Sequence, residues 1–443
     1  MKNTLSFALV AVSILFAGLP VYAQTTSAVQ YSQSEQTVRG QSNLEKPTFR
    51  APIQGESVFE RSRPDYEPIG IRAGSFVFSP GITFSTQYND NIFTSDDSDG
   101  GNKTGDTIFI VTPGLRVDSD WDSHSLTFRA SARSGTYADN STQDYTDALV
   151  AVNGAYDISR NFFLSGGLSS QQLHEERGSP NDLVGNQFGP TKYYLSIINA
   201  GITRDVGLIG FNIDSNVSRW DYNRAGTLNN NDRDRDDYDV SGKVNYTFME
   251  GYKAFVKVGA NTREYDNSVD LNGFRRSSTG NEYRVGTNFD LTDLLTGELY
   301  TGWAWQDYKD SRFSTIKTPV YGASLLWDVS GTTSLKASAT RQIEDSVQAD
   351  ISAYVASAYR VSLEHELLRN ILLGAALEYR SYDFRGISIS RDDNFYSGEI
   401  GARYLLNRIV VLGLDYGYYT RSSNASAQDY TQNTAMGTVG LKF

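Results

Sequence analysis

The chain ends in the stretch Gly437-Thr438-Val439-Gly440-Leu441-Lys442-Phe443, in which the alternate residues Val439, Leu441 and Phe443 are apolar. A period of two is that of a β-strand with an apolar face and a polar face. The pattern recurs from Gly74 onward, in runs of about ten residues joined by short turns and long acidic loops in alternation. Many weak strands of this kind, with no long apolar span among them, are typical of a β-barrel in an outer membrane.

The turns predict the number of strands. Nine long loops and eight short turns give eighteen strands in an antiparallel up-and-down barrel over residues 74–443, and a barrel of this width leaves an aqueous lumen. Sixteen strands is the competing count, because residues 191–204 and 317–328 alternate poorly. A soluble propeller or sandwich would not place aromatic residues at the strand ends. The short turns are expected at 120–123, 158–160, 205–207, 249–251, 292–293, 330–332, 367–369 and 406–408.

The composition agrees with a membrane barrel. The 443 residues are 12% aromatic and include 28 Tyr, although the mean hydropathy is only -0.42. Tyr and Trp are enriched where a membrane meets water. The net charge of -12 argues against a nucleic-acid-binding protein, which would show a basic face. Much of the acidity lies in the expected loops.

The first residues have the features of a secretory signal peptide, predicted over residues 1–23. Lys2 is followed by an apolar core and by the small-residue site Val21-Tyr22-Ala23. Residues 24–73 are rich in Gln, Ser, Thr and Pro, and such a composition predicts a flexible periplasmic N-terminal arm. The alternative is that this arm folds back into the pore as a plug. The chain contains no Cys, which excludes disulfides and a lipoprotein anchor.

Alternation also predicts which side chains face the lumen. A charge on the lipid face near mid-bilayer costs roughly 2–4 kcal/mol for Arg or Lys, so charged residues within strands are expected to point inward. The main expected pore-lining residues are Arg116, Arg129, Arg133, Lys253, Lys257, Arg284, Arg360, Glu364, Glu378, Arg380, Glu399, Arg403 and Asp415. Further inward candidates are Lys243, Arg263, Lys336, Lys442, Asp214, Asp290 and Glu298.

Together these candidates are thirteen basic and seven acidic residues. One interpretation is a mildly cationic lumen that favours anions, because fixed charges act strongly on ions in confined water. The alternative interpretation is that the charges pair across adjacent strands and stiffen the wall, with Glu364, Glu378 and Glu399 neutralising the nearest cations.

Residues for catalysis or metal binding are not grouped in the sequence. The three histidines, His124, His174 and His365, fall on different expected strands or turns. This spacing offers neither a metal cluster nor a Ser-His pair. The sequence therefore predicts a protein that is not an enzyme and that needs no cofactor or metal.

One stretch resembles a known family. Residues 57–76, which read Ser-Val-Phe-Glu-Arg-Ser-Arg-Pro-Asp-Tyr-Glu-Pro-Ile-Gly-Ile-Arg-Ala-Gly-Ser-Phe, together with Pro80 and residues 88–93, resemble the entrance to the outer-membrane β-barrel porin family of type 2. The resemblance implies a protein of the bacterial outer membrane, and some family members are linked to exopolysaccharide or capsule production. The terminal Phe443 also resembles the aromatic residue by which the barrel-assembly machinery recognises its clients.

These observations predict a porin-like channel for passive passage of small hydrophilic solutes in a Gram-negative outer membrane. An outer-membrane component of polysaccharide export, working with other export components, is the first alternative. A structural or adhesive surface barrel is the second. The expected partners are outer-membrane lipid and lipopolysaccharide and the barrel-assembly machinery, and no nucleic acid.

Overall fold

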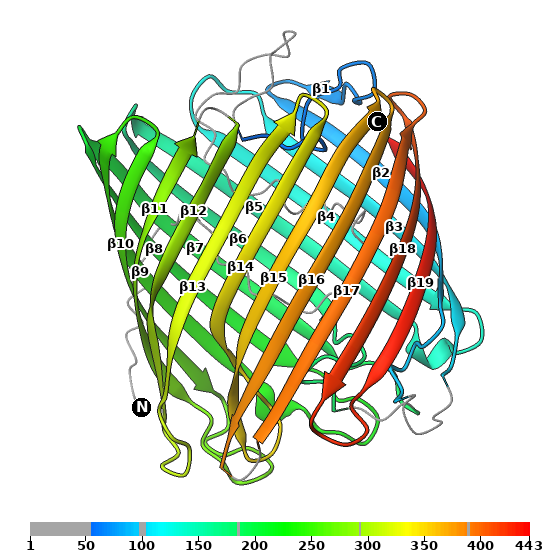
Figure 1. Cartoon of the computed structure of the whole chain (residues 1–443), viewed down its shortest axis with the longest axis vertical. Helices are drawn as coiled ribbons and strands as arrows, with labels where there is room; N and C mark the ends of the chain where they lie inside the picture. The colour runs from blue at the N-terminus through cyan, green and yellow to red at the C-terminus, as the bar shows by residue number, and fades with distance from the viewer. Residues whose placement is uncertain (1–54, 97–102, 184–186, 292–293, 388–389) are drawn as a thin grey trace, which may run out of the picture.

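The computed structural model describes residues 55–96, 103–183, 187–291, 294–387 and 390–443. The expected signal peptide and residues 24–54 of the expected arm lie outside these ranges. The strands form one antiparallel sheet in which β19 pairs with β2 as well as with β18, so that the sheet closes on itself. Figure 1 shows the resulting barrel with its tilted strands. Eighteen strands, β2 to β19, make up the wall, which confirms the count of eighteen and not that of sixteen.

The short strand β1 (Ile71–Ala73) pairs with β2, and each later strand pairs with the next in sequence. No helix in the described part of the chain is long and apolar enough to cross a membrane. The wall strands are β2 (Phe76–Asn89), β3 (Asp106–Ser119), β4 (Ser125–Tyr137), β5 (Tyr145–Ser159), β6 (Phe162–His174), β7 (Lys192–Val206), β8 (Ile209–Tyr222), β9 (Arg235–Met249), β10 (Tyr252–Tyr265), β11 (Ser278–Leu291), β12 (Leu295–Tyr308), β13 (Ile316–Ser330), β14 (Thr333–Asp345), β15 (Ile351–Leu368), β16 (Ile371–Gly386), β17 (Ser390–Leu405), β18 (Val410–Ser423) and β19 (Tyr430–Lys442).

The predicted short turns join the strands at one end of the barrel. Gly207 and Gly251 have φ of 60° and 77°, a left-handed conformation that glycine adopts at little cost. Residues 292–293 fall outside the described ranges, but Leu291 and Leu295 on either side of them pair directly. Because every short turn lies at the same end, the chain after β19 and the chain before β2 also lie there, as Figure 1 shows for the C-terminus.

The strands are longer than expected. Wall strands contain 13 to 18 residues, whereas about ten suffice to cross a bilayer at a typical tilt. The extra length lies beyond the membrane. An outward-facing row of tyrosines, which would mark the membrane boundary, lies within the strands and not at their ends. The row includes Tyr321, Tyr359, Tyr379 and Tyr396, whose rings contact one another in that order. We interpret the row as the outer aromatic girdle, beyond which the strands continue into water.

Candidate functional site

The lumen is the candidate functional site, and it is lined by the face of each strand opposite the lipid face. On β16, for example, Leu377 is 69% exposed on the lipid side, whereas Glu378 and Arg380 point the other way. Glu378 contacts Arg360 of β15, and Arg380 contacts Glu378. The structure places all the main expected pore-lining residues on this inner face, namely Arg116 on β3, Arg129 and Arg133 on β4, Lys253 and Lys257 on β10, Arg284 on β11, Arg360 and Glu364 on β15, Glu378 and Arg380 on β16, Glu399 and Arg403 on β17 and Asp415 on β18.

One part of the inner wall is electrically balanced. Arg360 of β15 donates to Glu378 over 2.8 Å and to Glu399 over 2.7 Å, and Arg380 donates to the second oxygen of Glu378. Lys336 of β14 lies 3.0 Å from Glu364. In this region, from β14 to β17, the glutamates neutralise the nearest cations. The alternative interpretation of paired charges therefore applies here, and these arginines add little net positive charge to the lumen.

A second part of the inner wall keeps an excess of cations. Arg129 of β4 lies directly opposite Arg116 of β3, and Lys257 of β10 lies directly opposite both Lys243 of β9 and Arg284 of β11. Like charges opposite each other on adjacent strands destabilise a sheet. We call the inner faces of β3–β4 and β9–β11 the cationic sector.

Carboxylates neutralise only part of the positive charge of the cationic sector. Glu298 pairs with Lys243, Glu282 pairs with Arg284 and Asp118 pairs with Arg116. Within the described ranges, no carboxylate oxygen lies within 4.0 Å of Arg133, Lys253 or Lys257, and the guanidinium of Arg133 instead lies 5.4 Å from the ring centre of Tyr145.

Some inward charges absent from the expected set occur as pairs two residues apart on one strand. Asp118 pairs with Arg116 and Glu282 with Arg284, while Arg235–Asp237 and Arg391–Asp393 form two more such pairs. Asp147, which contacts His174, and Asp239 are also inward. Alternation would have found Asp237 and Asp239, because Tyr238 and Val240 between and after them face outward. The expected ratio of thirteen cations to seven acids thus undercounts the acids.

The barrel is narrowed near its outer end by a hairpin that leaves the wall. β14 pairs with β13 only as far as Arg341 opposite Tyr321, so residues 316–320 of β13 pair with β12 alone. Beyond that point the end of β14 and the start of β15 fold inward. Their outer faces, with Ile343, Ala353 and Val355, pack against Tyr308 and Ile316 from the inner face of β12–β13. We call residues 342–355 the constriction hairpin.

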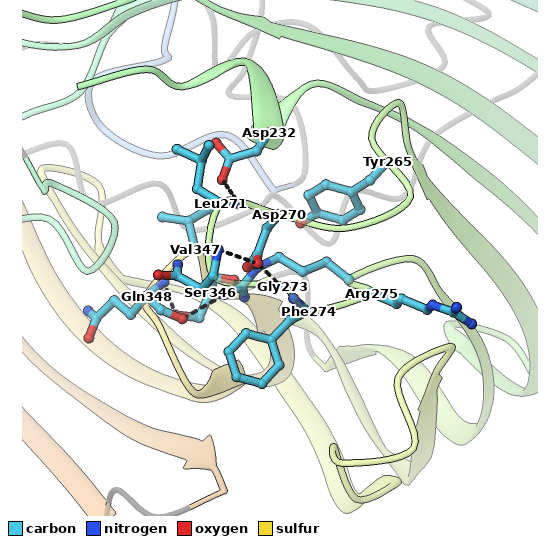
Figure 2. Close-up of polar contacts among 12 residues, drawn as sticks. Asp232, Tyr265, Asp270, Leu271, Gly273, Phe274, Arg275, Ser346, Val347 and Gln348 are labelled. Carbon is cyan, nitrogen blue, oxygen red and sulfur yellow. Dashed lines mark hydrogen bonds and ion pairs between the residues drawn. The ribbon is translucent and has the colours of Figure 1, made fainter. Parts of the chain in front are cut away.

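Ion pairs fasten the constriction hairpin to strands that are not its neighbours. Asp345 accepts from Arg263 over 2.5 Å and from the hydroxyl of Tyr265 over 3.0 Å. Arg276, in the loop between β10 and β11, donates to the carbonyls of Ser346 and Ile351 and pairs with Asp270. Figure 2 shows the backbone of Ser346–Gln348 beside Asp270 and Phe274 of that loop.

A second loop meets the hairpin from the opposite side. The loop between β6 and β7 contributes Asn181, whose amide nitrogen donates to the carbonyl of Asp345 over 3.2 Å, and Pro180, whose carbonyl accepts from Gln348 over 2.6 Å. Earlier in the same loop, Gly178 lies against the wall at β18, where its carbonyl accepts from Arg421 over 2.9 Å. The outer part of the lumen is therefore narrowed by chain segments that contact one another across it.

At the periplasmic end, part of the expected N-terminal arm lies inside the barrel. Residues 57–67, which we call the mouth segment, contact inner-face residues of β13 to β17. Ser57 and Val58 are completely buried, and Arg63 is 5% exposed. The expectation of a flexible arm up to residue 73 does not hold for this part, because its backbone and charged side chains bond to the wall.

The three histidines are held by structural contacts in different places. His124 accepts the backbone N–H of Asp157 and stacks on Tyr156, and His365 bonds the hydroxyl of Thr333. Among the described residues, no group of three or more His, Cys, Asp or Glu is placed to hold a metal ion.

A closed barrel of eighteen strands with an apolar outer face and a charged lumen defines the class of outer-membrane channel barrels. The family model described as "Putative beta-barrel porin 2" matches residues 63–443, and the chain belongs to this family. The protein is therefore a porin-like barrel of the bacterial outer membrane. Its family and fold are those of porin channels. No curated protein matches the chain.

Solved porins have similar barrels. OccK9 (OpdG) of Pseudomonas aeruginosa is 13% identical, with a TM-score of 0.45 over 83% of this chain and 98% of its own. A BenF-like porin from Pseudomonas fluorescens Pf-5 is 9% identical, with a TM-score of 0.45 over 83% of this chain and 99% of its own. OccK3 (OpdO) of Pseudomonas aeruginosa is 14% identical, with a TM-score of 0.43 over 83% of this chain and 96% of its own.

Proposed function

We propose that this porin conducts small hydrophilic solutes passively, without catalytic turnover, and that its lumen weakly favours anions. The single observation that carries the anion preference is the cationic sector, in which Lys253, Lys257 and Arg133 face confined water without a carboxylate within 4.0 Å in the described structure. The acidic character of the whole protein does not oppose this proposal, because much of that charge lies in the loops.

Charges on the pore wall should determine the ion preference, because electrostatic interactions in salt solution act over a short range. Water in a pore is confined between low-dielectric walls, so a fixed charge on the wall acts on a passing ion at close range. Charges on distant loops are screened over about 8 Å at physiological salt. The balanced part of the wall, from β14 to β17, contributes little, because Arg360 and Arg380 are bonded to Glu378 and Glu399. Selectivity should then depend on the cationic sector.

The test is the reversal potential of the channel in a planar bilayer under a KCl gradient. The wild-type protein should show a potential of the sign that indicates preference for Cl⁻. The triple variant Arg133→Gln, Lys253→Gln, Lys257→Gln should shift the potential toward cation preference. The matched control is Arg160→Gln, Lys309→Gln, Arg408→Gln, which removes the same charge from exposed turn and loop positions and should leave the potential nearly unchanged.

A wild-type channel that already prefers K⁺ would show that the loops determine the field, and the proposed role of the cationic sector would be wrong. Equal shifts in the two triple variants would lead to the same conclusion. If liposomes that contain the wild-type protein do not swell in small sugars and the bilayer shows no conductance, passive transport itself is excluded.

A further inference from the structure

We infer that the mouth segment, residues 57–67, is a releasable gate that reduces the opening of the channel at its periplasmic end. The inference rests on the proposed channel function. The segment lies at the end of the barrel that carries the short turns, next to β1 and the C-terminus (Figure 1). It contacts the inner face of the wall and no residue of the lipid face among the contacts described below.

The backbone of the segment bonds directly to wall side chains. The N–H of Val58 donates to the hydroxyl of Ser334 over 3.0 Å, and the N–H of Phe59 donates to the carboxylate of Glu364 over 2.9 Å. Ser334 belongs to β14 and Glu364 to β15, and the two residues lie opposite each other in the register. These two bonds fix the start of the segment across a pair of neighbouring strands.

Charged side chains extend the attachment along the wall. Arg61 donates to Asp328 over 2.7 Å and to the carbonyl of Gly331 over 2.6 Å. Arg63 donates to Glu366 over 2.6 Å. The ring of Phe59 lies under the guanidinium of Arg403 at 5.2 Å. The segment is therefore fastened to β13, β15 and β17.

The segment has its own internal bracing as well. Arg63 also donates to the carbonyls of Val58 and Arg61, and its own N–H bonds the carboxylate of Glu67. The segment is thereby folded into a compact turn that behaves as one unit. It is joined to the barrel by β1, which pairs with β2 through three residues only.

The nature of these contacts favours a gate over a permanent part of the wall. The segment is not part of the sheet: side-chain hydrogen bonds and ion pairs hold it, and it is tethered to the wall through the three residue pairs of β1 and β2, so it can leave the lumen without breaking the ladder of wall strands. The ion pairs of Arg61 and Arg63 are largely shielded from water, so reversing the charge of one partner strongly weakens the attachment. A chain lying face to face on a sheet takes up about 10 Å of space, so the segment narrows the mouth while it is attached.

Two variants test the gate, and both are measured as single-channel conductance. The release variant Arg61→Glu, Arg63→Glu places like charges opposite Asp328 and Glu366, and its conductance should exceed that of the wild type by on the order of twofold, because a layer about 10 Å thick leaves the mouth. The control Arg72→Glu removes an exposed ion pair with Asp120 outside the lumen and should conduct like the wild type.

The lock variant Val58→Cys, Ser334→Cys uses the absence of other cysteines in the chain. A gate that releases at intervals should give steps to larger conductance. Oxidation should form one disulfide that holds the segment in place, so that these steps disappear and the conductance is no larger than that of the wild type. Reduction of the same channel should restore the steps.

The outcomes separate the gate from the channel function. Equal conductance in the wild type, the release variant and the oxidised lock variant would overturn the gate and leave the channel function intact. If neither the wild type nor a release variant that folds, as judged by heat-dependent mobility on gels, conducts ions, both the gate and the channel function are wrong; if the wild type conducts and the folded release variant does not, only the gate is wrong. If the release variant does not fold, the difference between oxidised and reduced lock variant decides alone.

Discussion

The guanidinium of Arg263 lies 2.5 Å from the carboxylate of Asp345, although β11, β12 and β13 separate the strands that carry the two residues. Neighbouring strands in a sheet are about 4.8 Å apart, so strands four positions apart on a barrel wall are too distant for such contact. The ion pair is possible only because the end of β14 has left the wall and entered the lumen.

This ion pair leads to the first prediction. Asp345→Asn should loosen the constriction hairpin and raise the channel conductance, because Arg263 and Arg235 lose their shared carboxylate partner. Removing one partner of a buried ion pair typically costs about 3–5 kcal/mol. Here the loss should destabilise the attachment of the hairpin and not the wall below Arg341. Planar-bilayer recording measures the effect, with the exposed Asp392→Asn as control. Unchanged conductance, together with unchanged amide exchange at residues 346–351, would contradict the prediction.

The lipid face gives the second prediction. Leu363 of β15 lies on the lipid side, between Tyr359 of the outer girdle and the periplasmic turn at Leu368. Leu363→Arg should destabilise the barrel by roughly 2–4 kcal/mol, the cost of a cation near mid-bilayer. Thr112→Arg, on the inner face of β3, should change stability little because its side chain reaches water. Urea unfolding in lipid vesicles compares the two, and similar losses would show that the assigned faces are wrong.

The third prediction concerns the effect of acid on the loop between β12 and β13. The loop between β12 and β13 is held by Asp310, which accepts from the guanidinium of Arg312 and from the backbone N–H groups of Arg275 and Arg312. The bond from Arg312 is the largest cause that lowers the pKa of Asp310 well below its ordinary value.

A lowered pKa means that the stabilisation by Asp310 is fully present above the ordinary pKa of an aspartate and is lost as the pH falls through the lowered one. The loop should therefore stay closed from pH 7 to about pH 4 and open only in stronger acid. Hydrogen exchange at Phe313 follows the loop, and Asp310→Asn should open it at every pH. Opening of the wild-type loop between pH 6 and pH 5 would show that another group controls it.

The fourth prediction concerns assembly. Phe443 follows the strand that closes the barrel, and its backbone N–H donates to the carbonyl of Pro80 over 3.0 Å. Its side chain remains half exposed and thus adds little to the packing of the folded barrel. Phe443→Ser should lower the amount of folded protein in the outer membrane without changing the unfolding of what does fold, whereas Phe443→Tyr should assemble normally. A loss of stability with normal assembly would assign Phe443 a structural role only.

The strands and turns of the wall could be predicted from the sequence because they depend on local features. A turn residue such as Gly207 and the alternation of side chains depend on near neighbours, so the turns, the strand count and the inward direction of Arg360 or Lys257 follow from the sequence. The ion-pair partners of Arg360 do not follow, since they depend on the register between β15, β16 and β17.

Poor alternation in two strands has a definite cause. β7 carries Tyr193 and Leu195 on its inner face, where they form a buried cluster with Trp220 and Tyr222 of β8. β13 carries the buried Val320 on its inner face, the same face on which Ile316 packs against the constriction hairpin. Both faces of these strands are apolar near the outer end, so a period of two is hidden there. For the mouth segment, the sequence left a flexible arm and a fold back into the pore as alternatives. Its contacts could not be predicted, because they join residues far apart in sequence, such as Val58 and Ser334.

The inward fold of the constriction hairpin makes the outer end of the wall two sheets thick at β12 and β13. Where the wall crosses the membrane it is a single sheet with lipid on one side and water on the other. Beyond the tyrosine row, Ile343 and Val355 of the hairpin are packed face to face with Ile316 of β13, as in a small β-sandwich in water. Apolar substitutions there should follow the rules of a soluble protein core, in which cavities cost stability, and should be insensitive to the choice of lipid.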